Sequence, residues 1–195
     1  LVGGNSPPYV FDTAMARELA RQANDLARQR GASLLITTSP RTRPEAAAAL
    51  RQAIAGPSFF HEWTSDPDAN PYLGLLALAD EFIVTGESMS MAAEACSTGK
   101  PVHLFDMGWG WSAMRPPGHP GLAASRGLGE RLAPQRLKHW ALAHLLPERV
   151  RRDVRVILRR LVEEGHATWL GDPVPAARNP APNDRDEAVA RVRAL

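Results

Sequence analysis

Two loops rich in glycine and serine have the composition of an anion-binding site. Gly3–Ser6 follows the apolar start of the chain, and Gly86–Ser90 precedes a segment with helical spacing. At the start of a helix, several backbone N–H groups have no partner within the helix, and the helix dipole favours negative charge. These loops therefore predict a phosphate or another anion as ligand. The alternative is that Ser88 only caps the helix that follows it.

Charged side chains near these loops extend the prediction to a nucleotide or a nucleotide sugar. Arg41 or Arg43 would add positive charge opposite a phosphate. Glu94, about one and a half turns into the helix after Ser88, would accept hydrogen bonds from sugar hydroxyls. Glu87 lies at the turn itself, where it would act as a base or bind a hydroxyl. The candidate ligand-binding residues are Gly3, Gly4, Asn5, Ser6, Arg41, Glu87, Ser88, Ser90 and Glu94.

Other kinds of site have weaker support, and the sequence identifies no catalytic residue. The alternative for the residues above is that Glu94 is a surface carboxylate and the glycines serve turns. The six histidines show no zinc-binding spacing, so we predict no metal. Gly3–Ser6 is not the G-x-G-x-x-G fingerprint of dinucleotide sites, so we predict no nicotinamide cofactor, only a nucleoside diphosphate sugar as substrate. His103 lies in an apolar run and is predicted to be a hydrogen-bonded core residue.

The elements that must position these residues alternate along the chain. Leu1–Val2 ends a first strand, and apolar runs predict strands at Ser33–Thr38, Ser58–Trp63, Phe82–Thr85 and Val102–Phe105. Helical spacing and capping residues predict helices at Thr13–Arg30, Thr42–Gly56, Pro71–Ala79 and from Ser88 to Gly99.

This alternation predicts an α/β fold with a Rossmann-like parallel sheet and helices on both faces. Ligands of such sheets bind beyond the carboxyl ends of the strands. Four loops follow those ends and would converge on one crevice: 3–6, 38–41, 64–70 and 86–90.

The pattern changes after Asp106. Residues 107–129 are rich in glycine, proline and tryptophan and show no period. Helices are predicted at 135–146, 148–164 and 181–195. We therefore divide the chain into a nucleotide-binding core at residues 1–130 and a C-terminal helical extension of the same domain at residues 131–195.

Charge, hydrophobicity and cysteine content limit the kinds of partner that we expect for this chain. The net charge is only +2, and the arginines of 149–160 lie on a helical pattern whose other face is apolar, so we predict no nucleic acid partner. No apolar run approaches the ~18 residues of a membrane span, which leaves peripheral membrane association and a protein partner open. The single cysteine, Cys96, excludes an internal disulfide and favours the cytoplasm.

Four motifs resemble the mitochondrial fission ELM family, which is known from plants and has many bacterial members. They are VGGN at 2–5, LLITTS at 34–39, NPYLGLLALAD at 70–80 and GESMSMAAEACSTGKPV at 86–102. The last motif is quite specific, and the similarity covers roughly residues 1 to 106. The composition, rich in alanine and arginine, is typical of a bacterial member.

The resemblance implies a fold similar to the C-terminal half of GT-B glycosyltransferases. In those enzymes the first glycine loop contacts the donor's phosphates, and a later Gly/Ser turn leads into a helix whose glutamate binds ribose. By position, Gly3–Ser6 matches the first loop, Ser88 the later turn and Glu94 the ribose-binding glutamate. Where the transferases usually have glycine, this chain has Glu87, whose negative charge repels a diphosphate.

The same resemblance implies that the acceptor site, and commonly the catalytic base, lie in an N-terminal half. The chain has no initial methionine and opens on a strand end, so we interpret it as a fragment that binds without turnover. We predict the nucleoside-diphosphate-sugar-binding domain of a transferase, with half of a nucleotide-sugar epimerase as an alternative. In plants the family is implicated in organelle fission through a dynamin-like partner, so an interaction scaffold is a further alternative.

Overall fold

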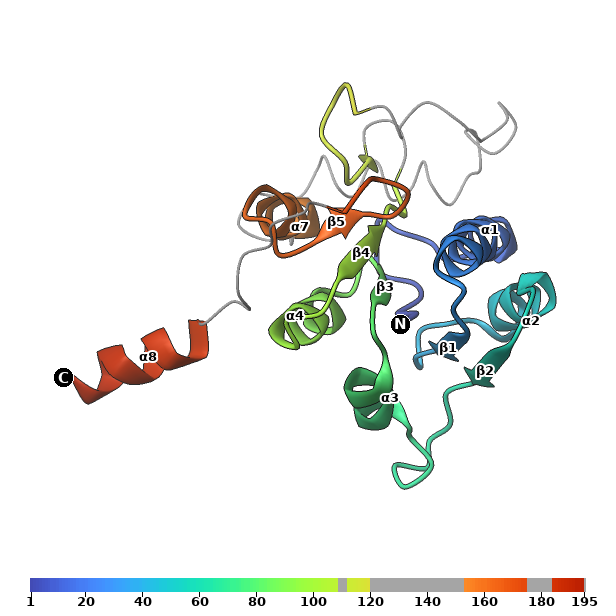
Figure 1. The fold of residues 1–195 in the computed structure, drawn as a ribbon, viewed down its shortest axis with the longest axis horizontal. Helices are drawn as coiled ribbons and strands as arrows, with labels where there is room; N and C mark the ends of the chain where they lie inside the picture. Colours follow the sequence, from blue (N-terminus) through green and yellow to red (C-terminus); the bar gives the residue numbers. More distant parts are fainter. Residues whose placement is uncertain (109–111, 120–152, 175–183, 195) are drawn as a thin grey trace.

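The computed structural model describes residues 1–108, 112–119, 153–174 and 184–194. Strands and helices alternate along the chain (Figure 1), which confirms the predicted α/β, Rossmann-like fold. The predicted helix at 135–146 lies outside the described residues. The elements are α1 (Thr13–Arg30), β1 (Leu34–Thr37), α2 (Pro44–Ala53), β2 (Ser58–His61), α3 (Tyr72–Leu78), β3 (Phe82–Thr85), α4 (Met89–Ser97), β4 (Val102–Phe105), α7 (Val154–Glu163), β5 (Thr168–Trp169) and α8 (Asp184–Arg193).

The strands form two parallel groups, and the first residues of the chain join them. β1 pairs with β2, and β3, β4 and β5 pair in that order, all in parallel. The N–H of Val2 donates to the carbonyl of Thr37 at 3.0 Å, and the N–H of Thr85 donates to the carbonyl of Leu1 at 3.2 Å. Leu1 and Val2 therefore occupy the strand position between β1 and β3. The resulting order is β2, β1, residues 1–2, β3, β4, β5.

Helices cover both sides of this sheet. α1 and α2 pack together on one side, and α4 and α7 pack together on the other (Figure 1). All four residues of β4 are buried, as expected for a central parallel strand between two helical layers. His103 of β4 is 2% exposed and its Nε2 lies 2.9 Å from Glu81 Oε2. This confirms that His103 is a hydrogen-bonded core residue.

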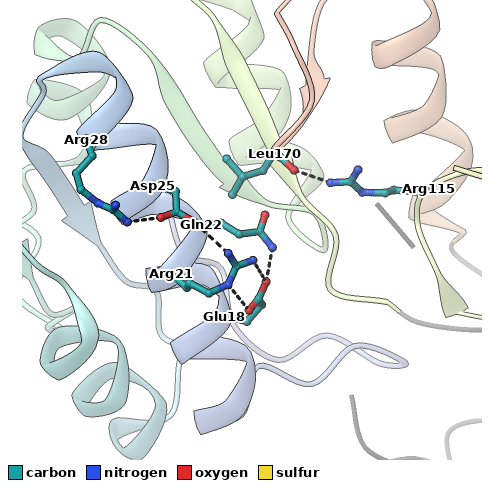
Figure 2. Close-up of polar contacts among 7 residues, drawn as sticks. All are labelled: Glu18, Arg21, Gln22, Asp25, Arg28, Arg115 and Leu170. Carbon is teal, nitrogen blue, oxygen red and sulfur yellow. Dashed lines mark hydrogen bonds and ion pairs between the residues drawn. The ribbon is translucent and has the colours of Figure 1, made fainter. Parts of the chain in front are cut away.

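The long helix α1 has the bounds that its sequence predicts. The Asp12 carboxylate accepts a hydrogen bond from the N–H of Met15 at 2.8 Å, and Gly31 ends the helix with a φ of 62°. The buried face carries mostly alanine and leucine. Ion pairs link the charged side chains of the outward face (Figure 2), and such exposed pairs add little stability; they join Glu18, Arg21, Asp25 and Arg28.

The C-terminal part differs from its predicted pattern in two places. Asp153 has an extended backbone, and its carboxylate accepts a hydrogen bond from the N–H of Arg155 at 3.0 Å, so it caps the start of α7. The prediction of one continuous helix over 148–164 is therefore wrong at Asp153. The second difference is β5, which extends the sheet beside β4 between the predicted helices 148–164 and 181–195, where no strand was predicted. Two residues are too few to show a strand period.

The described part of segment 107–129 is held by hydrogen bonds. The Asp106 carboxylate accepts from the backbone N–H groups of Gly108, Met114 and Arg115 at 2.7 to 3.1 Å. The guanidinium of Arg159 donates to the carbonyl of Met114 at 2.8 Å. Arg115 in turn donates to the carbonyl of Leu170 after β5 (Figure 2) at 2.6 Å. In this described part, the lack of periodicity corresponds to turns that side chains hold in place.

Among the described residues, no helix is both long enough and apolar enough to cross a lipid bilayer.

The packing of α7 on the sheet predicts a large loss of stability for Leu158→Ala. Leu158 is fully buried beneath the turn at Gly86, whereas Val156 of the same helix is 65% exposed. Removing the buried side chain should cost about 2–5 kcal/mol of unfolding free energy, while Val156→Ala should change it by no more than about 0.5 kcal/mol. Urea unfolding of both variants measures this. Equal losses would show that α7 does not pack as described.

Candidate functional site

The candidate site lies at the carboxyl edge of the sheet, between residues 1–3 and β3. After residues 1–2 the chain builds β1 and β2 on one side of this central strand, and it then crosses to build β3, β4 and β5 on the other side. The strand order therefore reverses at residues 1–2. Loops that leave neighbouring strands in opposite directions open a crevice at such a point. Gly3–Ser6, the segment from Ser39 to Arg41, and Gly86–Ser88 meet there.

The glycine loop packs closely against the loop after β1. Gly4 forms a parallel bridge with Arg41, and the N–H of Asn5 donates to the carbonyl of Arg41 at 3.0 Å. Gly4 has a φ of 102°, and a Cβ at this position would lie 2.3 Å from the Arg41 carbonyl oxygen. Both the backbone conformation and the close approach therefore require glycine.

The polar residues of this loop make hydrogen bonds to other residues of the chain. The side-chain oxygen of Asn5 accepts the N–H of Phe11 at 2.7 Å. Ser6 and Tyr9 exchange two backbone hydrogen bonds across the turn that holds them together. These contacts shape the loop. Because the N–H groups of Gly3, Asn5 and Ser6 also donate within the chain, the loop can offer a ligand at most the N–H of Gly4.

Two buried hydroxyl residues outside the predicted ligand-binding set, Ser39 and Thr85, hold the central strand in place. The Thr85 hydroxyl accepts the N–H of Gly3 at 2.8 Å. The Ser39 hydroxyl donates to the carbonyl of Gly3 and accepts the N–H of Arg41 at 3.2 Å. The sequence feature that could have indicated them is their position, because each is a small hydroxyl residue at the end of an apolar strand.

Glu87 is the unusual group of the site. Its side chain is fully buried, and its two carboxylate oxygens have no hydrogen-bond partner among the described residues. A Cβ on Gly3 would lie 1.9 Å from Glu87 Oε1, so a side chain at this position would displace the carboxylate. The guanidinium of Arg41 lies 3.6 Å from the same oxygen, and the Arg41 side chain is 46% exposed.

The burial of Glu87 changes its protonation. Loss of hydration raises the pKa of the Glu87 carboxyl to about 7. The nearby Thr85 hydroxyl, the amide of Glu87 itself, the Arg41 guanidinium and the amino group of Leu1 act in the opposite direction, more weakly. A carboxyl group with this pKa is partly protonated at neutral pH. It can then donate a hydrogen bond as well as accept one.

Ser88 begins α4, but its hydroxyl does not make the usual capping hydrogen bond. It is 5% exposed and lies beside Gly3, because a Cβ on Gly3 would be 3.0 Å from the Cβ of Ser88. The start of α4 therefore lies beside the glycine loop.

Ser90 and Glu94 lie apart from this cluster in their contacts. Both are exposed, and their spacing of four residues places them on one face of α4. The Glu94 carboxylate accepts a hydrogen bond from the Tyr72 hydroxyl of α3. Burial, together with that hydrogen bond, raises the pKa of Tyr72 above its ordinary value. The structure thus brings Gly3, Gly4, Asn5, Ser6, Arg41, Glu87 and Ser88 together, and it links Glu94 to Tyr72.

Comparison with known proteins identifies the family of this chain. The family model described as mitochondrial fission ELM1 matches residues 1–161. The chain belongs to the mitochondrial fission ELM1 family. Its match therefore includes the glycine loop, the Arg41 loop, the Glu87 turn and most of α7.

Two relatives show what share of a full-length family protein this chain matches. It is 34% identical over 108 residues to the mitochondrial fission protein ELM1 of Arabidopsis thaliana, covering 50% of this chain and 25% of that protein. It is 28% identical over 106 residues to the uncharacterized protein RP120 of Rickettsia prowazekii (strain Madrid E), covering 54% and 30%. The chain thus spans less than a third of either relative. No solved structure matches.

The buried carboxyl of this ELM1-family chain predicts a stability that falls as the pH rises from about 4.5 to about 7. Across that range the folded state keeps a proton on Glu87 that the unfolded state, with the ordinary pKa of 4.5, has lost. The full loss above pH 7 is at most about 3 kcal/mol. Glu87→Gln removes the titration, so its stability advantage over the parent should grow between pH 4.5 and pH 8. Urea unfolding at both pH values measures it.

The comparison with the parent is needed because the Leu1 amino group acts in the opposite sense. Burial lowers its pKa to about 6, so its contribution favours folding as the pH rises from about 6 to 8. The difference between Glu87→Gln and the parent isolates the carboxyl. The same advantage at pH 4.5 and pH 8 would contradict a raised Glu87 pKa.

Proposed function

We propose that this chain is the nucleoside-diphosphate-sugar-binding half of a GT-B-like glycosyltransferase. The observation that carries the proposal is the meeting of the Gly3–Ser6 loop, the N-terminus of α4 and the Arg41 side chain at the strand-order reversal. The N–H groups at the start of α4, the helix dipole and an exposed guanidinium at one point favour a phosphate. The acceptor and the catalytic base would come from another part of the full protein.

The remaining candidate residues fit the sugar side of a nucleotide. Glu94 lies on the exposed face of α4, one turn beyond Ser90, and its carboxylate already binds one hydroxyl, that of Tyr72. A ribose would replace or share this hydroxyl partner. Tyr72 adds an aromatic ring beside the carboxylate, which suits a bound ribose and base.

The protonation of Glu87 reconciles this proposal with the carboxyl group at the turn. An ionised Glu87 repels a diphosphate, whereas a protonated one donates a hydrogen bond to it. Because its pKa is about 7, protonation near neutral pH costs little. Phosphate binding and proton binding then favour each other, so affinity should fall as the pH rises above 7.

The test is a titration of the chain with UDP, GDP and ADP sugars at pH 6 and pH 8, followed by thermal unfolding. A ligand at about 100 times its Kd stabilises the folded state by about 2.7 kcal/mol, which raises Tm by roughly 5–10 °C in a chain of this size. We expect such a shift for at least one nucleotide, and a smaller shift at pH 8 than at pH 6.

Two glycine variants test whether the shift comes from this site. Gly4→Ala places a methyl group against the Arg41 backbone and should abolish the nucleotide-dependent shift. Gly31→Ala also has a positive φ, but nothing lies within 4 Å of the added carbon, so it should lower Tm slightly and keep the shift. Glu94→Ala should reduce the shift without abolishing it. A shift that survives Gly4→Ala would place the ligand elsewhere.

An interaction scaffold is the second candidate function. It is favoured by the buried carboxyl of Glu87 at the position where a diphosphate requires positive or neutral groups. The similarity to a plant protein named for mitochondrial fission also supports a role in assembly. The same titration separates the two candidates, because a scaffold shows no nucleotide-dependent shift at either pH.

A further inference from the structure

The helix α3 has an apolar face that lies open among the described residues. None of its seven residues is charged. Leu73 and Leu78 are 76% and 75% exposed, and Gly74 and Ala77 between them are exposed as well. The spacing of these four residues places them on one side of the helix, which we name the outer face of α3. Exposed apolar surface of this kind marks a place where another molecule binds.

The sheet beside α3 exposes apolar side chains on the same side. Leu35 of β1 and Phe59 of β2 are register partners, and they are 38% and 48% exposed. Phe60 points the opposite way, because Arg51 of α2 lies over its ring at 4.2 Å. Leu35 and Phe59 therefore face away from α2, toward the side of the sheet on which α3 lies (Figure 1). Parallel strands usually have helices over both faces, so this side of the sheet has room for a further helix.

The outer face of α3 has the same order of residue sizes from either end. It reads large, small, two inward positions, small, large. When two copies of α3 cross antiparallel, with a twofold axis between positions 75 and 76, Leu73 of each copy meets Leu78 of the other, and Gly74 meets Ala77. Outside α3, no described residue lies within 4 Å of the place of a Cβ on Gly74, so the second helix can approach closely there. The face is therefore complementary to itself.

Charge and area favour the same occupant. Because α3 has no charged side chain, two copies do not repel each other at the crossing, and antiparallel helices oppose their dipoles. The side chains of Leu73, Leu78, Leu35 and Phe59 together expose on the order of 500 Å² of apolar surface. A stable homodimer buries about 800 Å² per subunit, of which about 65% is apolar. The apolar area on this side thus matches the need of a dimer.

We propose that the outer face of α3 is the contact surface of a twofold-symmetric homodimer, in which the two α3 helices cross antiparallel at Gly74 and Ala77. The dimer does not use the residues of the proposed nucleotide site. Tyr72 lies on the opposite side of α3, where its hydroxyl donates to Glu94 of α4. Both copies therefore keep their candidate functional sites open.

Size-exclusion chromatography with light scattering tests the dimer at about 1 to 100 µM protein, a range in which interfaces of modest area assemble. At the upper end the parent should have about twice the 21.2 kDa mass of one chain. Leu73→Glu and Leu78→Lys should each be monomeric, because each buries a charge against a leucine. Val156→Glu, on a 65% exposed residue of α7, should leave the dimer intact. A monomeric parent, or a dimer that survives Leu73→Glu, would overturn the proposal.

Mixing the two charged variants tests the antiparallel register. In a mixed dimer the new carboxylate of Leu73→Glu faces the new ammonium group of Leu78→Lys at one contact, while leucines meet at the equivalent contact. We expect the mixture to recover the dimer that each variant loses alone. Both positions are exposed, so the variants should keep the parent's circular dichroism spectrum and Tm. A mixture that stays monomeric would contradict this crossing.

Cysteine cross-linking provides a measurement that needs no charged variant. The native Cys96 is buried, so the added thiols are the ones that react. Under mild oxidation, an equal mixture of Leu73→Cys and Leu78→Cys should form disulfide-linked pairs about tenfold faster than either variant alone, because across the axis each position meets the other and not itself. Equal rates would overturn the antiparallel arrangement. A parent dimer that is lost on removal of residues 184–194 would assign the contact to α8 and overturn it as well.

Discussion

The central ladder between residues 1–2 and its two neighbours is the interaction on which the rest of the structure depends. Without the hydrogen bonds from Val2 to Thr37 and from Thr85 to Leu1, the β1–β2 pair and the β3–β5 group would be separate. A two-stranded pair is marginal on its own. Joined, the strands form one twisted layer with helices on both sides, which buries residues that neither group could cover alone.

This ladder also explains why glycine is required at its carboxyl end. Directly after Val2 the chain passes beside Glu87 and then beside the Arg41 backbone, and at both points a Cβ would overlap a neighbour. The same constraint places the loop backbone against the start of α4. The chemistry of the candidate site and the packing of the sheet thus have one cause, the close approach of three chain segments where the strand order reverses.

Sequence patterns predicted the parts of the fold whose signal is local. α1 has capping residues at both ends, and β3 and β4 are runs of four residues between turn signals, so their bounds agree with the structure. β5 has only two residues and depends on pairing with β4, more than sixty positions away. Asp153 had the type of a capping residue, but the apolar spacing that continues through it suggested an unbroken helix.

The candidate site also divides into residues with a local sequence signal and residues that depend on long-range contacts. The glycine loop and the Ser88 turn were predicted because each lies between a predicted strand and a predicted helix. Ser39 and Thr85 were not, because their hydroxyls bind Gly3 across 36 and 82 positions and no spacing reports such contacts. The sequence placed Glu87 at the turn and indicated repulsion of a diphosphate. Only the structure shows that its carboxylate is buried with no hydrogen-bond partner among the described residues, and that this burial raises its pKa.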